Sequence, residues 1–305
     1  MKRFFTPRLL LMTCMALMPV LLHAQGFDKT MPPQDPLMIS YFQNRYLANP
    51  AMAGADSGLS INVGYRKQWK EVPDAPVTFA LTGDYRLGRK MGIGLTVFND
   101  QAGPLKQNRV ALTYAYHLRL SEDDNESLHI GLTGAIDNRH IEKRKNMPQD
   151  PYVEAFNKKG SEFQADFGIA YTNDKLTLQA SLPNITRTFR NSDEVEPRST
   201  PSFFVAASYK LGTKCPQINS IEPLVAFRGV KGYKPVGDVG AKVNFYRNTV
   251  NMFAMYHTNN AVSAGVGFQF KNSIEVQASY TSQTSGPKTN VDANFGLGIK
   301  IRLFR

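Results

Sequence analysis

The stretch Asn108–Leu120 alternates between apolar residues and small or polar ones. One parity holds Val110, Leu112, Tyr114, Tyr116, Leu118 and Leu120, and the other holds Ala111, Thr113, Ala115, His117 and Arg119. Side chains alternate faces along a strand, so this stretch predicts a strand with one aromatic-rich apolar face. A soluble sheet buries such a face in its core, whereas a transmembrane barrel turns it toward lipid. The alternation alone leaves both folds open.

The same alternation recurs from residue 58 to the end of the chain. It predicts about fourteen strands of about 9–13 residues, the length that a tilted membrane strand needs. The segments before and after Asn108–Leu120 are 59–66, 77–86, 91–97, Leu128–Asp137, Phe163–Tyr171, Leu176–Leu182, Phe203–Leu211, Ile221–Arg228, Val236–Tyr246, Val250–His257, Val262–Lys271, Ile274–Thr281 and Asn294–Phe304.

The connections between these segments alternate in length. Tight links are expected at Leu87–Lys90, Asn173-Asp174, Arg247-Asn248 and Asn272-Ser273, where Asn and Asp favour short hairpins. Longer links are expected at Lys67–Ala75, Asp100–Gln107, Arg139–Ser161 and Pro183–Thr200. Outer-membrane barrels have this asymmetry, with short periplasmic turns and long outer loops.

The two walls of the strands also differ in chemistry. Tyrosines stand near strand ends on the apolar parity, where an interfacial aromatic girdle belongs; they are Tyr65, Tyr85, Tyr116, Tyr171, Tyr209, Tyr256 and Tyr280. Charges stand on the other parity with many Gly, Ser and Thr; they are Arg66, Asp84, Asp137, Asp166, Lys242, Glu275 and Lys300. Such a wall suits a polar lumen. We therefore favour an all-β fold, an outer-membrane antiparallel β-barrel of about fourteen strands over residues 58–305, above a soluble sandwich.

The first 24 residues have the pattern of a secretory signal peptide. Lys2, Arg3 and Arg8 precede the apolar run Leu9–Leu22, and a small residue, Ala24, ends the segment. We expect cleavage after Ala24 and export to the bacterial outer membrane. The chain of 305 residues has a formal net charge of +11, to which this segment contributes three basic residues and no acidic one. Only one cysteine, Cys215, follows it, so no internal disulfide is expected in the mature chain.

Residues 25–57 do not alternate and are predicted to be a non-strand segment. They hold four prolines, and Leu37–Tyr46 is expected to form one short helix. Their apolar and aromatic content, including Tyr41, Phe42 and Tyr46, predicts packing inside the barrel mouth as a periplasmic or plug-like segment.

No catalytic, cofactor or metal motif stands out. The pairs Gly92/Gly94, Gly265/Gly267 and Gly296/Gly298 lie inside strand patterns, which favours relief of crowding on the inner wall over a dinucleotide loop. The histidines lack metal-ligand spacing, and no nucleophile–base pair is visible. The basic run Arg139–Lys145 lacks the interleaved aromatics of a nucleic-acid site and is read as a solvated loop or a contact with lipopolysaccharide or an acidic partner.

Short motifs in the first half of the chain resemble the PorP/SprF family of Bacteroidota. The resemblance rests on Gln34-Asp35-Pro36, Ser40-Tyr41-Phe42, Asn49-Pro50-Ala51-Met52-Ala53-Gly54, Tyr65-Arg66-Lys67-Gln68-Trp69, Gly92-Ile93-Gly94-Leu95, Asn99-Asp100, Gly103-Pro104 and Tyr114-Ala115-Tyr116. It covers roughly residues 34–120 distinctively. Within these motifs the candidate plug or family-motif residues are Gln34, Asp35, Pro36, Tyr41, Asn49, Pro50, Gly54, Arg66, Gln68, Trp69, Asn99 and Asp100.

The resemblance implies a non-enzymatic outer-membrane component of type IX protein secretion and, in gliding species, of motility. Its implied partners are a secreted surface adhesin at the outer loops and machine components on the periplasmic side, besides lipid and lipopolysaccharide. An outer-membrane channel or transporter for small or hydrophobic solutes is the alternative, because larger barrels leave room for a ligand. An outer-membrane hydrolase is a third.

Overall fold

The computed structural model describes residues 41–68, 75–121, 125–142, 150–188, 201–230, 235–283 and 293–304. Within them the helical elements are α2 (Arg45–Ala48), η3 (Pro50–Met52), α3 (Pro151–Lys158) and α4 (Ile185–Thr188). The strands are β1 (Leu59–Gln68), β2 (Val77–Leu87), β3 (Met91–Ala102), β4 (Leu105–Arg119), β5 (Ser127–Ile141), β6 (Ser161–Thr172), β7 (Leu176–Leu182), β8 (Pro201–Tyr209), β9 (Leu211–Gly212), β10 (Ile218–Val230), β11 (Val236–Phe245), β12 (Val250–His257), β13 (Ala261–Phe270), β14 (Ile274–Gln283) and β15 (Ala293–Leu303).

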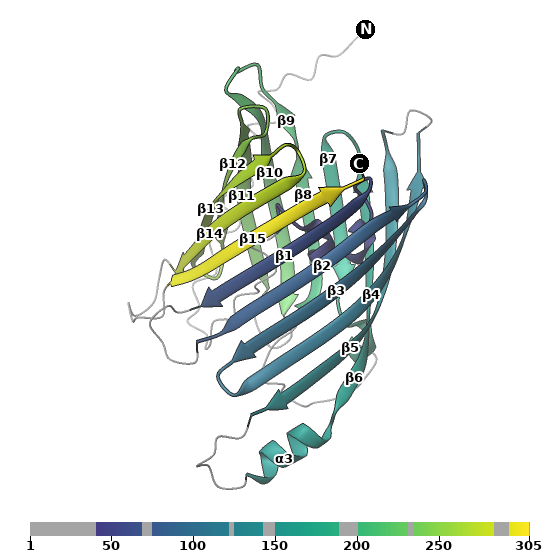
Figure 1. Ribbon diagram of the computed structural model, residues 1–305, viewed down its shortest axis with the longest axis vertical. Coiled ribbons are helices and arrows are strands. Elements are labelled where there is room, and N and C mark those ends of the chain that lie inside the picture. Colours follow the sequence, from purple (N-terminus) through teal and green to yellow (C-terminus); the bar gives the residue numbers. More distant parts are fainter. Residues whose placement is uncertain are drawn as a thin grey trace. The chain divides into compact units, whose positions relative to one another are not determined.

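The strands form one closed antiparallel barrel (Figure 1). β8 and β9 both pair with β10 as one interrupted strand, so the described residues build a wall of 14 strands. The last strand closes the wall on the first, in a register that runs from Leu59 opposite Leu303 to Gln68 opposite Asn294. Closure satisfies the backbone of both strands that an open sheet would leave at its edges, as lipid requires.

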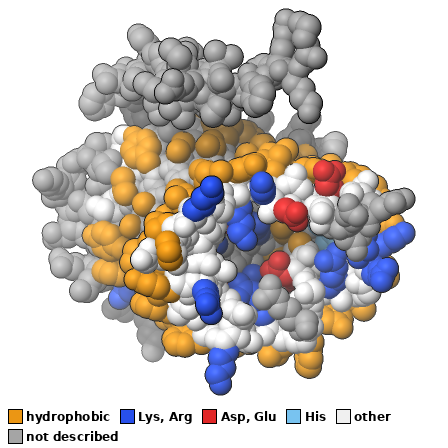
Figure 2. Space-filling model, turned by 90° about the horizontal axis from the view of Figure 1, so that it is seen from above, with side chains coloured by type: hydrophobic (Ala, Val, Ile, Leu, Met, Phe, Trp, Pro, Cys, Tyr) orange, Lys and Arg blue, Asp and Glu red, His pale blue; other side chains and the backbone are white. Residues whose placement is uncertain are grey.

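The wall is apolar outside and polar inside, which confirms the predicted barrel. In β4, Val110 is 50% exposed and Leu112 68%, whereas Ala111, Ala115 and His117 on the other parity are buried. The predicted tyrosine girdle also lies on the outer face, with Tyr65, Tyr85 and Tyr280 exposed. Figure 2 shows the same division from above, with hydrophobic side chains around the outside and charged ones around a hollow. An outward apolar band around a polar lumen is typical of a membrane barrel. In the described ranges, no helix has the length and hydropathy to cross a membrane.

Two sequence-based expectations about local structure were wrong. The helix expected at Leu37–Tyr46 is confined, in the described part from residue 41 onward, to Arg45–Ala48. It begins there because the Asn44 side chain accepts a hydrogen bond from the Leu47 N–H and caps the first turn. The link expected at Asp100–Gln107 is a tight turn, because β3 and β4 stay paired as far as Ala102 and Leu105. Gly103, with φ of +57°, supplies the positive φ that so short a turn uses.

Several strand boundaries also moved. β4 begins at Leu105 and not at Asn108, and β10 extends over Ile218–Val230 on both sides of the expected Ile221–Arg228. Pro223 stays inside β10, opposite Ala241 of β11. The tight links after β2, β6, β11 and β13 fall where they were expected.

Candidate functional site: a segment held inside the lumen

Residues 41–57, which we call the lumen segment, lie inside the barrel and not along its wall (Figure 1). Two asparagines define their path. The Asn44 side chain begins α2, and the Asn49 side chain accepts a hydrogen bond from the Ala51 N–H (3.0 Å) to begin η3. Pro50 occupies the first turn of η3, where its missing N–H costs nothing. The asparagines and the proline therefore give the segment a compact, self-capped shape.

Aromatic side chains anchor one side of the lumen segment. Tyr41 packs against Phe204 with ring centroids 5.6 Å apart, and Phe42 packs against Phe253 at the same distance. The Tyr41 hydroxyl also accepts a hydrogen bond from the Gln179 amide (2.8 Å). Desolvation by burial raises the pKa of the Tyr41 phenol to about 12. This apolar cluster is one of the few places where aromatic residues face inward from the described wall.

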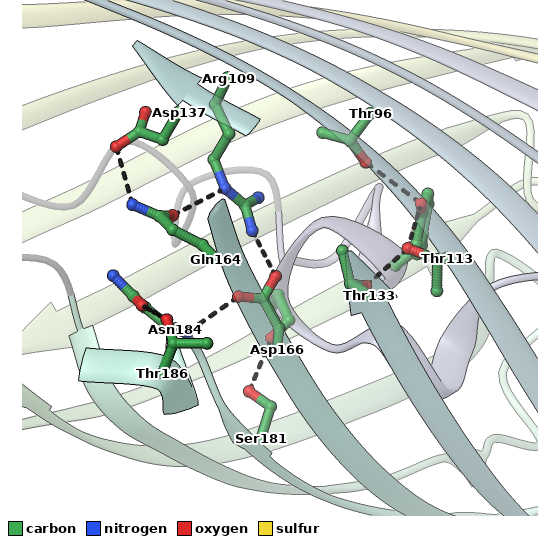
Figure 3. Close-up of polar contacts among 12 residues, drawn as sticks. Thr96, Arg109, Thr113, Thr133, Asp137, Gln164, Asp166, Ser181, Asn184 and Thr186 are labelled. Atoms are coloured by element: carbon green, nitrogen blue, oxygen red, sulfur yellow. Dashed lines mark hydrogen bonds and ion pairs between the residues drawn. The ribbon is translucent and has the colours of Figure 1, made fainter. Parts of the chain in front are cut away.

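Hydrogen bonds fix the other side of the segment. The Tyr46 hydroxyl donates to Thr113 Oγ1 (2.8 Å) and accepts from Thr96 (3.2 Å), and Thr113 bonds in turn to Thr133 (2.7 Å). Figure 3 shows Thr96, Thr113 and Thr133 in a chain across three neighbouring strands. The Asn49 amide donates to the backbone oxygens of Ile169 and Ala180 (3.1 and 3.3 Å). The Asn44 amide donates to Thr82 of β2 (2.8 Å) and Arg45 pairs with Glu222 of β10, half the barrel away, so the segment is bonded to opposite walls.

Glycines on the inner wall make room for the segment. Gly131 of β5 and Gly168 of β6 are cross-strand partners. A Cβ on Gly131 would overlap the backbone of Pro50, and one on Gly168 would overlap the Asn49 side chain. The same holds for Gly92 beneath Ala53, Gly94 beneath Tyr46, and Gly298 beneath Gln43. The predicted relief of crowding is thus confirmed at Gly92, Gly94 and Gly298.

Ion pairs join the segment to the wall beside a polar cavity of about 610 Å³ at the tight-turn end of the lumen. Arg45 pairs with Glu222 of β10, and Lys300 of β15 lies 3.3 Å from Asp56. Lys242 Nζ lies 3.7 Å from Glu222, and Arg302 lies 3.1 Å from Glu275. Seen from above, Lys and Arg side chains surround this hollow with a few acidic ones among them (Figure 2).

A second polar network crosses the inner wall toward the long-link end. Arg109 lies 2.5 Å from Asp166, and Gln164 donates to Asp137 (2.8 Å), as Figure 3 shows. The other Asp166 oxygen accepts the Asn184 N–H (2.8 Å) just before α4. These bonds satisfy charges that the barrel holds away from bulk water.

Three residues have the order of a hydrolase relay, which sequence reasoning missed. Asp238 lies 2.5 Å from His257 Nδ1, and His257 Nε2 lies 2.8 Å from Ser263 Oγ. Ser263 is fully buried, however, and also bonds to Thr281 (2.8 Å). Its backbone belongs to the strand ladder, which leaves no free N–H groups there to stabilise an oxyanion. We interpret the trio, with Arg228 3.1 Å from Asp238, as a structural polar network.

Two further histidines form a pair inside the barrel. His117 and His129 join their Nδ1 atoms at 2.7 Å, and His129 Nε2 bonds to Thr172. No group of three or more His, Cys, Asp or Glu side chains in the described ranges has the arrangement of a metal site.

A family model for the type IX secretion system membrane protein PorP/SprF matches residues 30–300. The chain belongs to this family. Together with the barrel, membership identifies an outer-membrane protein associated with type IX secretion. The search of curated proteins found no match to the chain.

Solved barrels resemble the PorP/SprF chain only distantly. The outer-membrane protein Omp33 of Acinetobacter baumannii has a TM-score of 0.49 at 7% identity, with 82% of this chain and 100% of Omp33 covered. The toluene transporter TbuX of Ralstonia pickettii has a TM-score of 0.48 at 10% identity, with 92% and 96% covered. These similarities are too low to carry a function to this chain.

The structure brings some of the family-motif residues together. Tyr41, Asn49, Pro50 and Gly54 belong to the lumen segment, where the Gly54 N–H donates to Asp84 (3.0 Å). On the wall, Arg66, Gln68 and Asp100 are buried, and Thr78 donates to Asp100 (2.7 Å).

The remaining motif residues lie elsewhere. Asn99 points outward and bonds to Asn108 (2.5 Å) near the long-link end. Gln34, Asp35, Pro36 and Trp69 lie outside the described residues.

Sequence reasoning missed Glu222 and Gln179 as the wall residues that bond to Arg45 and Tyr41 of the lumen segment. The inward parity of Gln179 and Glu222 was the only available signal.

Proposed function

We propose that this PorP/SprF protein is a non-enzymatic docking barrel. It retains a secreted surface protein through its long-link side and contacts type IX secretion components through its tight-turn side, while the lumen segment plugs the lumen. Family membership supports the assignment to type IX secretion. The observation that carries the docking role is the lumen segment itself, because an open pore has no use for a segment bonded to opposite walls.

The plug is supported by how many strands hold it. Side-chain or backbone bonds run from the segment to β2, β3, β4, β6, β7, β10, β14 and β15. Releasing it would break a ring of contacts and uncover the Tyr41–Phe204 cluster. An occupied interior leaves the connections at the two ends of the barrel as its surfaces for partners.

The long-link side offers an ordered surface for a client. The Asp150 side chain caps the start of helix α3 by accepting a hydrogen bond from the Tyr152 N–H (2.9 Å). Asn157 ties the helix to the end of β5 by accepting the Ile141 N–H (2.7 Å) and donating to its C=O (2.9 Å). Tyr152 is left 63% exposed. An aromatic on a fixed helix can bind with little loss of conformational entropy.

Planar-bilayer conductance tests the plug. We expect the intact mature protein to show no steady conductance and a variant lacking residues 26–54 to conduct. A large conductance in the intact protein, unchanged by the deletion, would refute the plug. It would favour the alternative, a channel for small solutes, for which the cavity of about 610 Å³ is the supporting observation.

Surface retention tests the docking role. In cells that secrete through the type IX system, Tyr152→Ser with Asn157→Ala should shift secreted proteins from the cell surface to the medium. Phe304→Ser is the control for loss of an exposed aromatic, because Phe304 is 80% exposed but follows the end of β15, away from α3. Equal retention in both variants and in cells without the protein would contradict the proposal.

A further inference from the structure

The charge around the tight-turn end is unevenly distributed. Four hairpin connections lie side by side around the barrel, between β6 and β7, β8 and β10, β11 and β12, and β13 and β14. They carry five exposed basic residues, which we call the basic rim: Lys175, Lys210, Lys214, Arg247 and Lys271. Asp174 is the one acidic residue in these connections, all of which are described. In the sequence, by contrast, the β4–β5 connection, 120–126, is rich in acidic residues.

The basic rim continues into the lumen. Lys175 and Lys210 line the cavity of about 610 Å³, and Lys242, Lys300 and Arg302 line it further inside. The inner cations have the carboxylate partners given above, whereas the Lys175 and Lys210 side chains have no ion-pair partner in the described part of the chain. The lining also holds carboxylates, including Asp174 and the partners of the inner cations, so the positive charge without ion-pair partners lies at the mouth, where it attracts anionic ligands.

The cavity also presents unused hydrogen-bond acceptors. The side-chain oxygens of Asn62 and Asn251 are buried and lack a hydrogen-bond partner among the described residues. Both residues line the cavity. Buried polar atoms normally have partners, so these oxygens point to a ligand or water that donates hydrogen bonds.

We propose that the tight-turn mouth binds an acidic, extended polypeptide segment of a partner. Its carboxylates lie against Lys175 and Lys210, and its backbone N–H groups reach Asn62 and Asn251. A peptide combines both kinds of group. An anionic lipid offers phosphate but belongs on the apolar outer face, away from a cavity that opens inside the barrel. The proposal rests on the proposed function in assigning this side to secretion components.

Peptide binding to the mature protein in nanodiscs tests the proposal. The probes are a fluorescent peptide of alternating Glu and Gly and the same peptide with Gln in place of Glu. We expect binding of the Glu peptide alone, weakened about tenfold by Lys175→Glu with Lys210→Glu, since each lost pair also becomes a repulsion. The matched control is Arg89→Glu with Lys90→Glu, the same charge change in the exposed β2–β3 turn outside the basic rim. That variant should bind as the wild type does.

Four outcomes would overturn the proposal. The first two are no binding of the Glu peptide and equal weakening of its binding by both charge-reversed pairs. The third is that the Lys175/Lys210 variant retains less phosphatidylglycerol on purification but binds the peptide as the wild type does. The fourth is tighter peptide binding in Asp28→Asn with Asp35→Asn, which would identify the chain's own N-terminal residues as the occupant. None of them changes the conductance or surface-retention tests, so a failure here is distinguishable from a failure of the docking barrel.

Discussion

Replacing Gly131 with alanine should loosen the lumen segment without unfolding the barrel. The new methyl would overlap the backbone of Pro50 and Ala51, which, unlike the end of a flexible side chain, cannot turn aside. Adding a methyl to a packed site costs about 1–3 kcal/mol. Because each 1.4 kcal/mol is a factor of ten, the undocked population of the segment should rise roughly 5- to 150-fold.

Gly134→Ala is the matched control on the same strand. Its Cβ would point outward and lie 3.6 Å from the Phe163 ring, an ordinary contact. Both substitutions remove a strand glycine and so share a gain of about 0.5–1 kcal/mol. The difference between the two variants therefore isolates the overlap with the lumen segment.

Amide hydrogen exchange measures this difference. The N–H groups of Met52 and Ala53 bond to the Asn49 and Pro50 carbonyls (3.0 and 3.2 Å), so they exchange when the segment opens locally. We expect exchange of residues 49–53 to accelerate in Gly131→Ala alone, while β5 stays protected. Equal exchange in both variants would show that the segment does not press on Gly131, and the reasoning from the inner-wall glycines would be wrong.

Three further predictions concern single contacts. Tyr46→Phe removes the hydrogen bonds to Thr96 and Thr113, which should lower the free energy of local opening of the lumen segment by about 0.5–1.5 kcal/mol. Amide hydrogen exchange of residues 44–49 should then be faster, whereas Tyr114→Phe, on the outer face, should leave it unchanged. Burial raises the pKa of Tyr41 to about 12, above the usual value of about 10. The contribution of the neutral Tyr41 phenol to the stability of the fold is therefore complete below pH ~10 and lost as the pH rises toward ~12. Spectrophotometric titration should show one late-titrating phenol that is absent in Tyr41→Phe; an unchanged titration would contradict this. Leu112→Arg should destabilise folding into lipid vesicles by about 2–4 kcal/mol in a urea titration, and Phe304→Arg at the strand end by about 0–1 kcal/mol; similar values would deny that Leu112 faces lipid.

The outer wall could be predicted from the sequence because lipid makes a single demand on it. Every second residue of a strand must be apolar, as at Val110, Leu112 and Tyr114. This alternation can be recognised in a single strand without knowing which strands lie beside it. Hairpin turns were predictable for the same local reason, through their Asn, Asp and Gly residues. The Asp100–Gln107 link failed because polar residues at the end of a strand resemble a loop in sequence although they remain paired.

The contacts of the inner wall could not be predicted in this way. Arg45 and Glu222 are 177 residues apart, and their meeting depends on the depth and rotation of the lumen segment. Gly265 and Gly94 show that the neighbours of an inner-wall glycine cannot be predicted either. The atoms that crowd Gly265 include the Phe253 ring of the neighbouring strand, whereas Gly94 makes room for Tyr46 of the lumen segment. The two glycines look alike in sequence. Only the register and the occupant of the lumen distinguish their roles.

The inner wall and the lumen segment therefore have to be understood as one unit. Gly131 and Gly168 leave a flat patch that would be a void without Asn49 and Pro50 above it. The Asn49 amide in turn donates hydrogen bonds to the backbone carbonyls of Ile169 in β6 and Ala180 in β7. Because packed interiors tolerate neither voids nor overlaps, each side restricts the residues allowed on the other. The connections between strands are free of these restrictions on packing. We therefore expect the residues at α3 and at the basic rim to determine which partners the barrel binds.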